Sequence, residues 1–224
     1  MELTSEMLET LLLTLRLASI TTVILLAAGI PAAYWIAYSR SRLRPFVETL
    51  VSMPLVLPPT VLGFYLIVAF NPEGAIGKAL ESMLDLRLVF SFNGLVVASV
   101  IYSLPFMIQP LQAGFRNIPV SLAEASATLG KSPMQTLVRV LLPGMKPALL
   151  TGVVLSFAHT IGEFGVVLMI GGNIPGETRV ASIAIYDEVA ALRYGAANTY
   201  ALILFAIMFC ILLPVYWKKS PRPW

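Results

Sequence analysis

The stretch Ser121–Pro143, SLAEASATLGKSPMQTLVRVLLP, is a polar interruption in a mostly apolar chain. Ser121 and Glu124 have the Ser-x-x-Glu spacing of a capping box, which predicts the start of a helix. Gly130 predicts its end, because glycine readily takes the left-handed conformation of a helix C-terminus. Ser132, followed by a proline, predicts the start of a second helix. The stretch should therefore form an ordered helix-turn-helix outside lipid, either a docking surface for a soluble partner or a plain membrane-surface connector.

Composition places the rest of the chain in a membrane. Of 224 residues, 58% are hydrophobic and 12% charged, whereas soluble proteins carry about 25% charged residues. A crossing of about 30 Å of hydrocarbon takes roughly 20 helical residues. Five stretches meet this requirement: Leu11–Tyr38, Val47–Phe70, Phe92–Phe115, Ala148–Ile170 and Thr199–Trp217. The sequence predicts an all-α integral membrane protein with about five transmembrane helices and one domain, residues 1–224.

The distribution of charge predicts the orientation. Cytoplasmic loops of membrane proteins are enriched in Lys and Arg. One side of the predicted spans collects most of the basic residues: Arg40, Arg42, Arg44, Arg116, Lys131, Arg139, Lys146, Lys218, Lys219 and Arg222. The other side collects acidic residues, among them Glu2, Glu6, Glu9, Glu73, Glu81, Asp85, Glu177, Asp187 and Glu188. We expect the N-terminus outside and the C-terminus inside, which places Ser121–Pro143 in the cytoplasm. The basic excess follows from this bias and gives no support for nucleic-acid binding.

The second predicted span contains Pro54, Pro58 and Pro59. Each proline removes a backbone donor, and freed carbonyls at membrane depth are tolerated only where protein or water satisfies them. The span should be bent or broken and should face a protein interior or a pore. A packing kink and a gate element are both compatible with this pattern.

Glu163 is the one acidic residue well inside a predicted span. Such a residue is functional by default, and His159 lies four positions earlier, on the same helical face, where the two side chains could pair. The pair could act in gating or simply hold helices together. A zinc site needs three or four ligands, and no further ligands stand nearby. No nucleophile with a base is apparent either, so we expect neither a metal site nor an enzyme.

The polar stretch resembles the EAA loop of bacterial ABC importer permeases. That pattern is Glu-Ala-Ala, three residues, Gly, nine residues, then Ile-x-Leu-Pro. The residues in register are Glu124, Ala125, Ser126, Gly130, Val140, Leu142 and Pro143. Ser126 replaces the second alanine and Val140 replaces isoleucine. The resemblance implies a type I (MetI-like) permease fold in which a coupling helix, at about residues 121–130, contacts an ATPase.

A second resemblance points to the cargo. The stretches GEFG (162–165) and NIPGETR (173–179) resemble those of molybdate permeases, and the run PLVLPP in the second span does so too. Sulfate permeases share a related acid-Phe-Gly or acid-Tyr-Gly element but usually diverge after it and carry an additional N-terminal span. The resemblance covers nearly the whole chain and implies an importer for molybdate, and for tungstate.

The resemblance also implies the remaining components. These are a second copy of the chain, two cytoplasmic ATPase subunits and an outer molybdate-binding protein, assembled in a bacterial inner membrane. The chain has no Gly-x-x-x-x-Gly-Lys-Ser/Thr phosphate loop, so ATP-Mg and its hydrolysis belong to the ATPase, and the chain itself should bind no cofactor. Candidate groups lining the path are the hydroxyls of Thr60, Ser99, Ser103, Thr151, Ser156 and Thr160.

Three alternatives remain open at the level of sequence. One is a permease for sulfate, thiosulfate or another oxyanion. Another is a proton-coupled secondary transporter or channel in which Glu163 and His159 relay protons. The third is a membrane scaffold in which the polar helix-turn-helix is only an assembly site.

Overall fold

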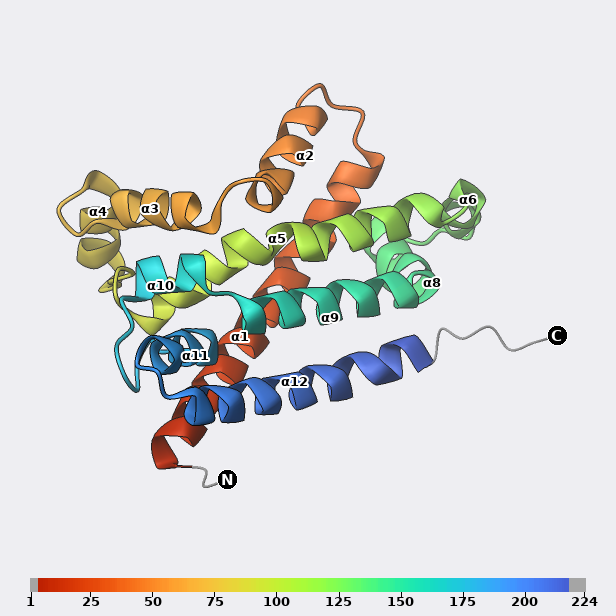
Figure 1. Cartoon of the computed structure of the whole chain (residues 1–224). Helices are drawn as coiled ribbons and strands as arrows, with labels where there is room; N and C mark the ends of the chain where they lie inside the picture. Colours follow the sequence, from red (N-terminus) through yellow and green to blue (C-terminus); the bar gives the residue numbers. More distant parts are fainter. Residues whose placement is uncertain (1–3, 218–224) are drawn as a thin grey trace.

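The computed structural model describes residues 4–217, without the side chains of residues 214–216. Glu2, Lys218, Lys219 and Arg222, used above to predict orientation, lie outside this range. The described residues form helices and no strand (Figure 1). The elements are α1 (Ser5–Tyr38), α2 (Arg44–Ser52), the 3₁₀ helix η1 (Met53–Leu55), α3 (Pro59–Phe70), α4 (Ala75–Leu84), α5 (Phe92–Asn117), α6 (Val120–Thr128), α7 (Pro133–Thr136), the π-helix η2 (Leu137–Leu141), α8 (Leu142–Gly144), α9 (Lys146–Gly162), α10 (Gly165–Gly171), α11 (Ala181–Ala190) and α12 (Tyr194–Trp217).

Among the described residues, the helices α1, α5 and α12 are each long and apolar enough to cross a membrane alone. Two further crossings are broken: Arg44–Leu55 joins Pro59–Phe70 at 112°, and Pro133–Gly144 joins Lys146–Gly162 at 79°. Counting each bent pair as one span gives up to five, as the sequence predicts.

The break in the second span lies where the prolines stand. Pro54 is buried in η1, Pro58 is the N-cap of α3 with extended backbone (φ −54°, ψ 135°), and Pro59 is its first residue. Proline is favoured at a first helical position because its missing N–H has no partner there. The predicted interruption is confirmed, and α3 leaves α2 at a steep angle.

The fourth span departs from the prediction. A single helix over Ala148–Ile170 is wrong, because α9 ends at Gly162 and α10 begins at Gly165. Glu163 at this junction has extended backbone (φ −67°, ψ 131°). The acidic residue therefore lies at a helix break and not within a helix.

Helix α5 forms the centre of the bundle and packs against both α1 and α9, which also pack against each other. Small residues allow this close approach, as is common between membrane helices. A Cβ on Gly114 of α5 would lie 2.6 Å from the Ala148 Cβ of α9, and one on Gly152 of α9 would lie 3.1 Å from the Met107 sulfur. One buried cluster around Met107 and Phe115 fills the α1–α5–α9 contact.

Helix α12 packs on α11 and presents most of its surface outward. Only 11% of its most apolar stretch is buried, and Phe205 and Phe209 are exposed.

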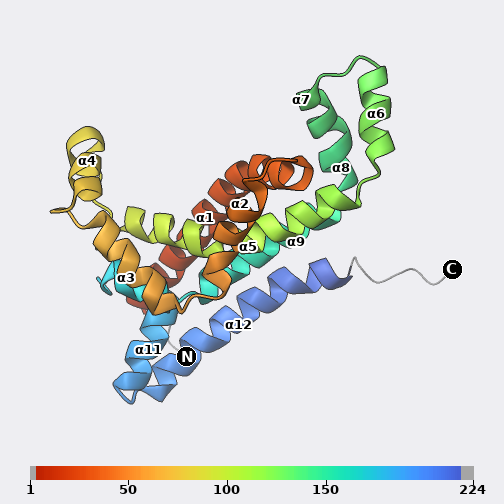
Figure 2. The same cartoon turned by 90° about the horizontal axis from the view of Figure 1, so that it is seen from above.

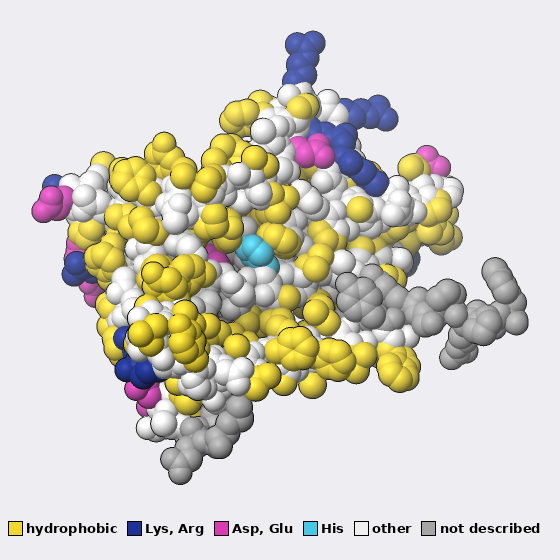
Figure 3. All heavy atoms as spheres, in the orientation of Figure 1, with side chains coloured by type: hydrophobic (Ala, Val, Ile, Leu, Met, Phe, Trp, Pro, Cys, Tyr) yellow, Lys and Arg dark blue, Asp and Glu magenta, His cyan; other side chains and the backbone are white. Residues whose placement is uncertain are grey.

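The bundle has two different ends. The views in Figures 1 and 2 both place the hairpin of α6–α8 at one end and α4 and α11 at the other, with the described ends of α1 and α12 far apart. In Figure 3, Lys and Arg side chains gather over the α1–α2 connection, which contains Arg40 and Arg42 and is followed by Arg44, the first residue of α2. The opposite end in this view carries both signs of charge.

Candidate functional site

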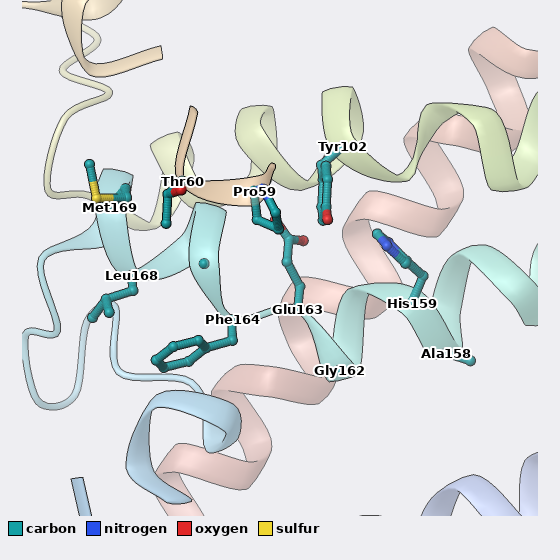
Figure 4. Close-up of a pocket in the computed structure, with 11 residues that line it drawn as sticks. Pro59, Thr60, Tyr102, Ala158, His159, Gly162, Glu163, Phe164, Leu168 and Met169 are labelled. Atoms are coloured by element: carbon teal, nitrogen blue, oxygen red, sulfur yellow. The ribbon is translucent and has the colours of Figure 1, made fainter. Parts of the chain in front are cut away.

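A cavity of about 550 Å³ lies where the two broken spans meet α5. Pro59 and Thr60 of α3, Tyr102 of α5 and His159 of α9 line it, together with the α9–α10 junction. Figure 4 shows these side chains converging from three different parts of the chain. The sequence groups the prolines and the His–Glu pair as separate candidates, and the fold brings Pro59, His159 and Glu163 to one cavity. Pro54 and Pro58 are not among its lining residues.

His159 is held in place by α5. Its Nδ1 lies 2.9 Å from the hydroxyl of Ser103, which also lies 3.1 Å from the Thr160 hydroxyl. The imidazole stacks on Phe106 with 3.9 Å between ring centroids, and Tyr102 lies on another side at 4.9 Å. These contacts fix the ring at the wall of the cavity.

The predicted contact between His159 and Glu163 is not formed. The expectation requires a continuous helix, in which residues four apart share a face, and α9 ends one residue before Glu163. Each side chain has its own environment instead: His159 bonds to α5, while the Glu163 backbone carbonyl accepts a hydrogen bond from the Ser182 hydroxyl of α11.

The Glu163 side chain is nearly inaccessible to solvent, with 3% exposure. Neither carboxyl oxygen has a hydrogen-bond partner among residues 4–217. Ser99 lies close to it, but the pair does not meet hydrogen-bond geometry. Figure 4 shows the carboxyl group directed toward Pro59 and Tyr102. A buried polar group without a partner is costly, so this carboxyl is free to bond to a ligand, water or a moving segment.

We expect Ser103→Ala to lower the free energy of unfolding by about 1–2 kcal/mol, because the His159 imidazole and the Thr160 hydroxyl both lose a partner. The change is measured as a lower Tm of the purified protein in detergent. Ser99→Ala is the matched control one turn earlier on α5, because the Ser99 hydroxyl is buried without a hydrogen bond. Equal Tm shifts for the two variants would contradict a role for Ser103 in holding His159.

The second candidate region is the hairpin of α6–α8. The predicted capping box of Ser121 and Glu124 is wrong. Helix α6 starts one residue earlier, at Val120, with Pro119 as its N-cap and no side-chain cap. Pro119 has an extended backbone (φ −56°, ψ 130°), so Ser121 already lies inside the helix and cannot cap it. Glu124 is exposed, and its carboxylate has no hydrogen bond or ion pair among the described residues.

The other two signals in the hairpin are confirmed. Gly130 has φ +71° and stands in a Schellman motif, in which two N–H groups satisfy the last carbonyls of a helix. The Gly130 N–H bonds to the Ala127 carbonyl at 2.9 Å and the Lys131 N–H to the Ser126 carbonyl at 3.1 Å. Ser132 caps α7 and forms a capping box with Gln135. The capping box of the hairpin therefore lies at Ser132 and not at Ser121, where it was predicted.

Ser126 has a structural role that the sequence pattern does not indicate. Its side chain is buried, and its hydroxyl lies 2.8 Å from the hydroxyl of Thr136 in α7. This bond joins the two arms of the hairpin. The alanine that the family pattern places here could not form it. Ala125 and Pro143, the other predicted positions, are exposed.

Large apolar side chains project from the hairpin into the surroundings. The exposed members are Val120, Leu122, Leu129, Met134 and Val138. A capped hairpin that exposes several large apolar side chains is typical of a docking element for another protein.

The hydroxyl groups predicted to line a transport path lie in different surroundings. Thr60 lines the cavity, and Ser103 and Thr160 support its histidine. Thr151 bonds to the Pro147 carbonyl within α9. Ser99 and Ser156 are fully buried. Tyr102 and Phe106 were not predicted as site residues, because no local pattern distinguishes them from core residues before α5 and α9 are brought together. Gly162 was noted only as part of the GEFG stretch.

Comparison with known proteins agrees with this arrangement. Residues 29–217 match the family model described as a binding-protein-dependent transport system inner membrane component. The chain is 48% identical over 216 residues to a molybdenum transport system permease protein, ModB, of Azotobacter vinelandii, covering 96% of each chain. It is also 32% identical over 177 residues to a probable sulfate transport system permease protein of Nephroselmis olivacea, covering 79% of this chain and 62% of that one.

The fold is similar to that of a solved methionine ABC transporter, MetNI, in an inward-facing conformation. The TM-score is 0.72 at 17% identity, covering 98% of this chain and 100% of that chain. This likeness establishes the fold, and the sequence matches establish the family. The chain therefore belongs to the binding-protein-dependent transport system inner membrane components, as a multi-pass permease of an ABC importer and not an enzyme.

Proposed function

We propose that two copies of this chain form the translocation pathway of an ATP-driven importer for molybdate, and for tungstate, which is also a tetrahedral dianion. The observation that carries the cargo assignment is 48% identity over 96% of the chain to a molybdenum permease, against 32% over 79% and 37% over 76% to two probable sulfate permeases. In this proposal, an outer molybdate-binding protein supplies the cargo and two cytoplasmic ATPases supply the energy.

The hairpin of α6–α8 is the proposed contact with the ATPase. Its exposed apolar residues lie at one end of the bundle, and Glu124, Ala125 and Gly130 are the positions that match the coupling pattern. The capping box of α7 and the bond between Ser126 and Thr136 hold the two arms of the hairpin together. The hairpin can therefore move as one rigid body when the ATPase moves. Closure of the ATPases would then move the attached spans as rigid elements.

The orientation in this proposal is N-terminus outside and C-terminus inside. It is supported by the basic α1–α2 connection at the same end of the bundle as the hairpin, in keeping with the enrichment of Lys and Arg in cytoplasmic loops. The orientation is tested with the variant Ser132→Cys in a Cys210→Ala background. A membrane-impermeant maleimide is used to label the new cysteine. Labelling only in inverted vesicles is expected, and labelling in intact cells would contradict it.

The cavity around His159 and Glu163 is the proposed path and gate. Its lining offers hydroxyl, imidazole and carboxyl groups but no Lys or Arg, so it would hold a dianion weakly. Weak binding suits a pathway, because a tightly bound ion leaves slowly. Pro54, Pro58 and Pro59 fix the bend of the second span that brings α3 to this cavity.

The second copy is proposed to cover the face that carries α3. Phe64 and Tyr65 are more than half exposed on α3, at 53% and 61%, and the cavity lies beside this helix. Cross-linking through a cysteine at Tyr65, again in the Cys210→Ala background, should yield a dimer. A matched cysteine at Phe205, on α12, should yield little, because α12 faces lipid in this arrangement.

The deciding experiment is uptake of labelled molybdate into liposomes that contain the permease, its ATPase and the binding protein. We expect uptake to require MgATP and to be inhibited more strongly by tungstate than by sulfate. A preference for sulfate would overturn the cargo assignment. Uptake driven by a proton gradient without ATP would overturn the ABC mechanism in favour of a proton relay through Glu163 and His159.

A further inference from the structure

A second cavity, of about 590 Å³, lies between the C-terminal end of α1 and the hairpin of α6–α8. Tyr34, Tyr38 and Arg40 line it from the side of α1, and Ala127 and Lys131 from the side of the hairpin. It lies at the opposite end of α9 from the cavity around Glu163 and shares no lining residue with it. This cavity has no part in the translocation path proposed above, although Val120 in its lining also belongs to the exposed apolar surface of the hairpin.

Two cations face this cavity without a counter-ion. Arg40 and Lys131 form no ion pair with any residue in the described range 4–217, and no acidic residue lines the cavity. Arg44, the first residue of α2, differs from Arg40, because its guanidinium pairs with Glu48 at 3.6 Å. Two unpaired cations that line one cavity attract an anion.

The walls of the cavity are apolar and aromatic on the side of the span. Tyr34 and Tyr38 pack together, with ring centroids 5.0 Å apart, and both pack against Phe115. The Tyr38 hydroxyl donates a hydrogen bond to the Phe115 carbonyl at 3.0 Å. Val120 and Leu141 continue the apolar lining. A free, fully hydrated anion gains little from such walls, whereas an amphipathic anion can place its headgroup at the cations and its chains along the apolar side.

The position of the cavity fits such a ligand. Tyr34, Trp35 and Tyr38 stand at the end of α1, and aromatic residues of this kind mark the boundary between hydrocarbon and water. Arg40 follows this boundary by two residues. Basic pockets beside transmembrane helices on the cytoplasmic side are suited to anionic lipid headgroups.

We propose that this cavity binds the phosphate headgroup of an anionic phospholipid of the inner leaflet, held by Arg40 and Lys131. The bound lipid connects the first span to the hairpin, because the two cations come from the two sides of the cavity. It would thereby hold the docking element at a fixed height above the membrane. This inference rests on the cytoplasmic placement of the hairpin in the proposed function.

The test uses the purified permease–ATPase complex in phosphatidylcholine nanodiscs that contain spin-labelled phosphatidylglycerol. The pocket variant Arg40→Gln/Lys131→Gln is compared with Arg42→Gln/Arg139→Gln, which removes the same charge from exposed positions outside the cavity. A direct hydrogen bond from a cation to a phosphate oxygen contributes about tenfold to binding, so the pocket variant should bind phosphatidylglycerol about 100-fold more weakly than the wild type. The control pair should retain nearly all of the binding.

Equal weakening in both pairs would overturn the inference, because it would mean general attraction to a basic surface. Displacement of the lipid by millimolar inorganic phosphate would overturn it as well, since the ligand would then be a soluble anion. Neither measurement depends on transport or ATP hydrolysis. If maleimide labelling at Ser132 confirms the orientation and lipid binding still fails, this inference alone falls. Labelling from the outside would instead overturn the proposed orientation.

Discussion

Gly162→Phe is expected to reduce molybdate uptake by about 100-fold while the protein still folds. Gly162 lines the cavity of about 550 Å³, and a Cβ at this position meets no heavy atom within 4 Å. The first side-chain atom therefore has open space, and the ring adds bulk at the wall of the cavity. The cargo ion must then pass through a space that the ring partly fills. This overpacking raises the barrier to passage by about 3 kcal/mol, which lowers the rate by a factor of about 100. Uptake into liposomes measures the effect.

Gly195→Phe is the matched control for this variant. Gly195 is an exposed helical glycine of α12, and a Cβ there also meets nothing within 4 Å. We expect normal uptake in this control, and normal copurification of the ATPase with both variants. Uptake at the wild-type rate by a correctly assembled Gly162→Phe complex would remove the cavity from the translocation path.

Gly130→Val is expected to uncouple ATP hydrolysis from transport. The backbone at Gly130 has φ +71°, a conformation that costs a β-branched residue about 2 kcal/mol. Such a cost shifts the equilibrium between the correctly formed hairpin and other conformations by about 30-fold. The added side chain itself has space, because no heavy atom lies within 4 Å of a Cβ here. The number of molybdate ions imported per ATP hydrolysed should fall, while the spans remain inserted.

Two further variants separate backbone strain from other causes. Gly130→Asn should recover most of the coupling, because asparagine tolerates the left-handed conformation. Gly176→Val imposes the same strain in the connection between α10 and α11, where φ is +76° and space is also open. It should leave the ratio of transport to hydrolysis unchanged. If Gly130→Val and Gly130→Asn transported equally well per ATP, the left-handed turn would not matter for coupling.

Local patterns predicted the elements whose cause is local. The left-handed turn at Gly130 and the cap at Ser132 follow from backbone preferences of single residues, and both are confirmed. The break at Pro58 and Pro59 follows from the missing backbone donors. The capping box at Ser121 was wrong, because the spacing is short and common and Pro119 already begins the helix.

The cavity residues could be predicted only in part. Glu163 was recognised as unusual because charge is rare in an apolar span. Its separation from His159 was not foreseen, since nothing in the local sequence required α9 to end at Gly162. Ser103 and His159 are 56 residues apart, so their bond depends on how α5 packs against α9.

The sequence by itself determined that the chain is an α-helical membrane protein with about five spans, one of them broken at its prolines, and a polar capped hairpin. Hydropathy and backbone preference act over a few neighbouring residues, so a sequence displays them directly. Only the tertiary structure decided that Pro59, His159 and Glu163 share a cavity, that Ser126 joins the hairpin arms through Thr136, and that Arg40 and Lys131 line a second cavity. These contacts arise when helices pack, because packing brings together side chains that are distant along the chain.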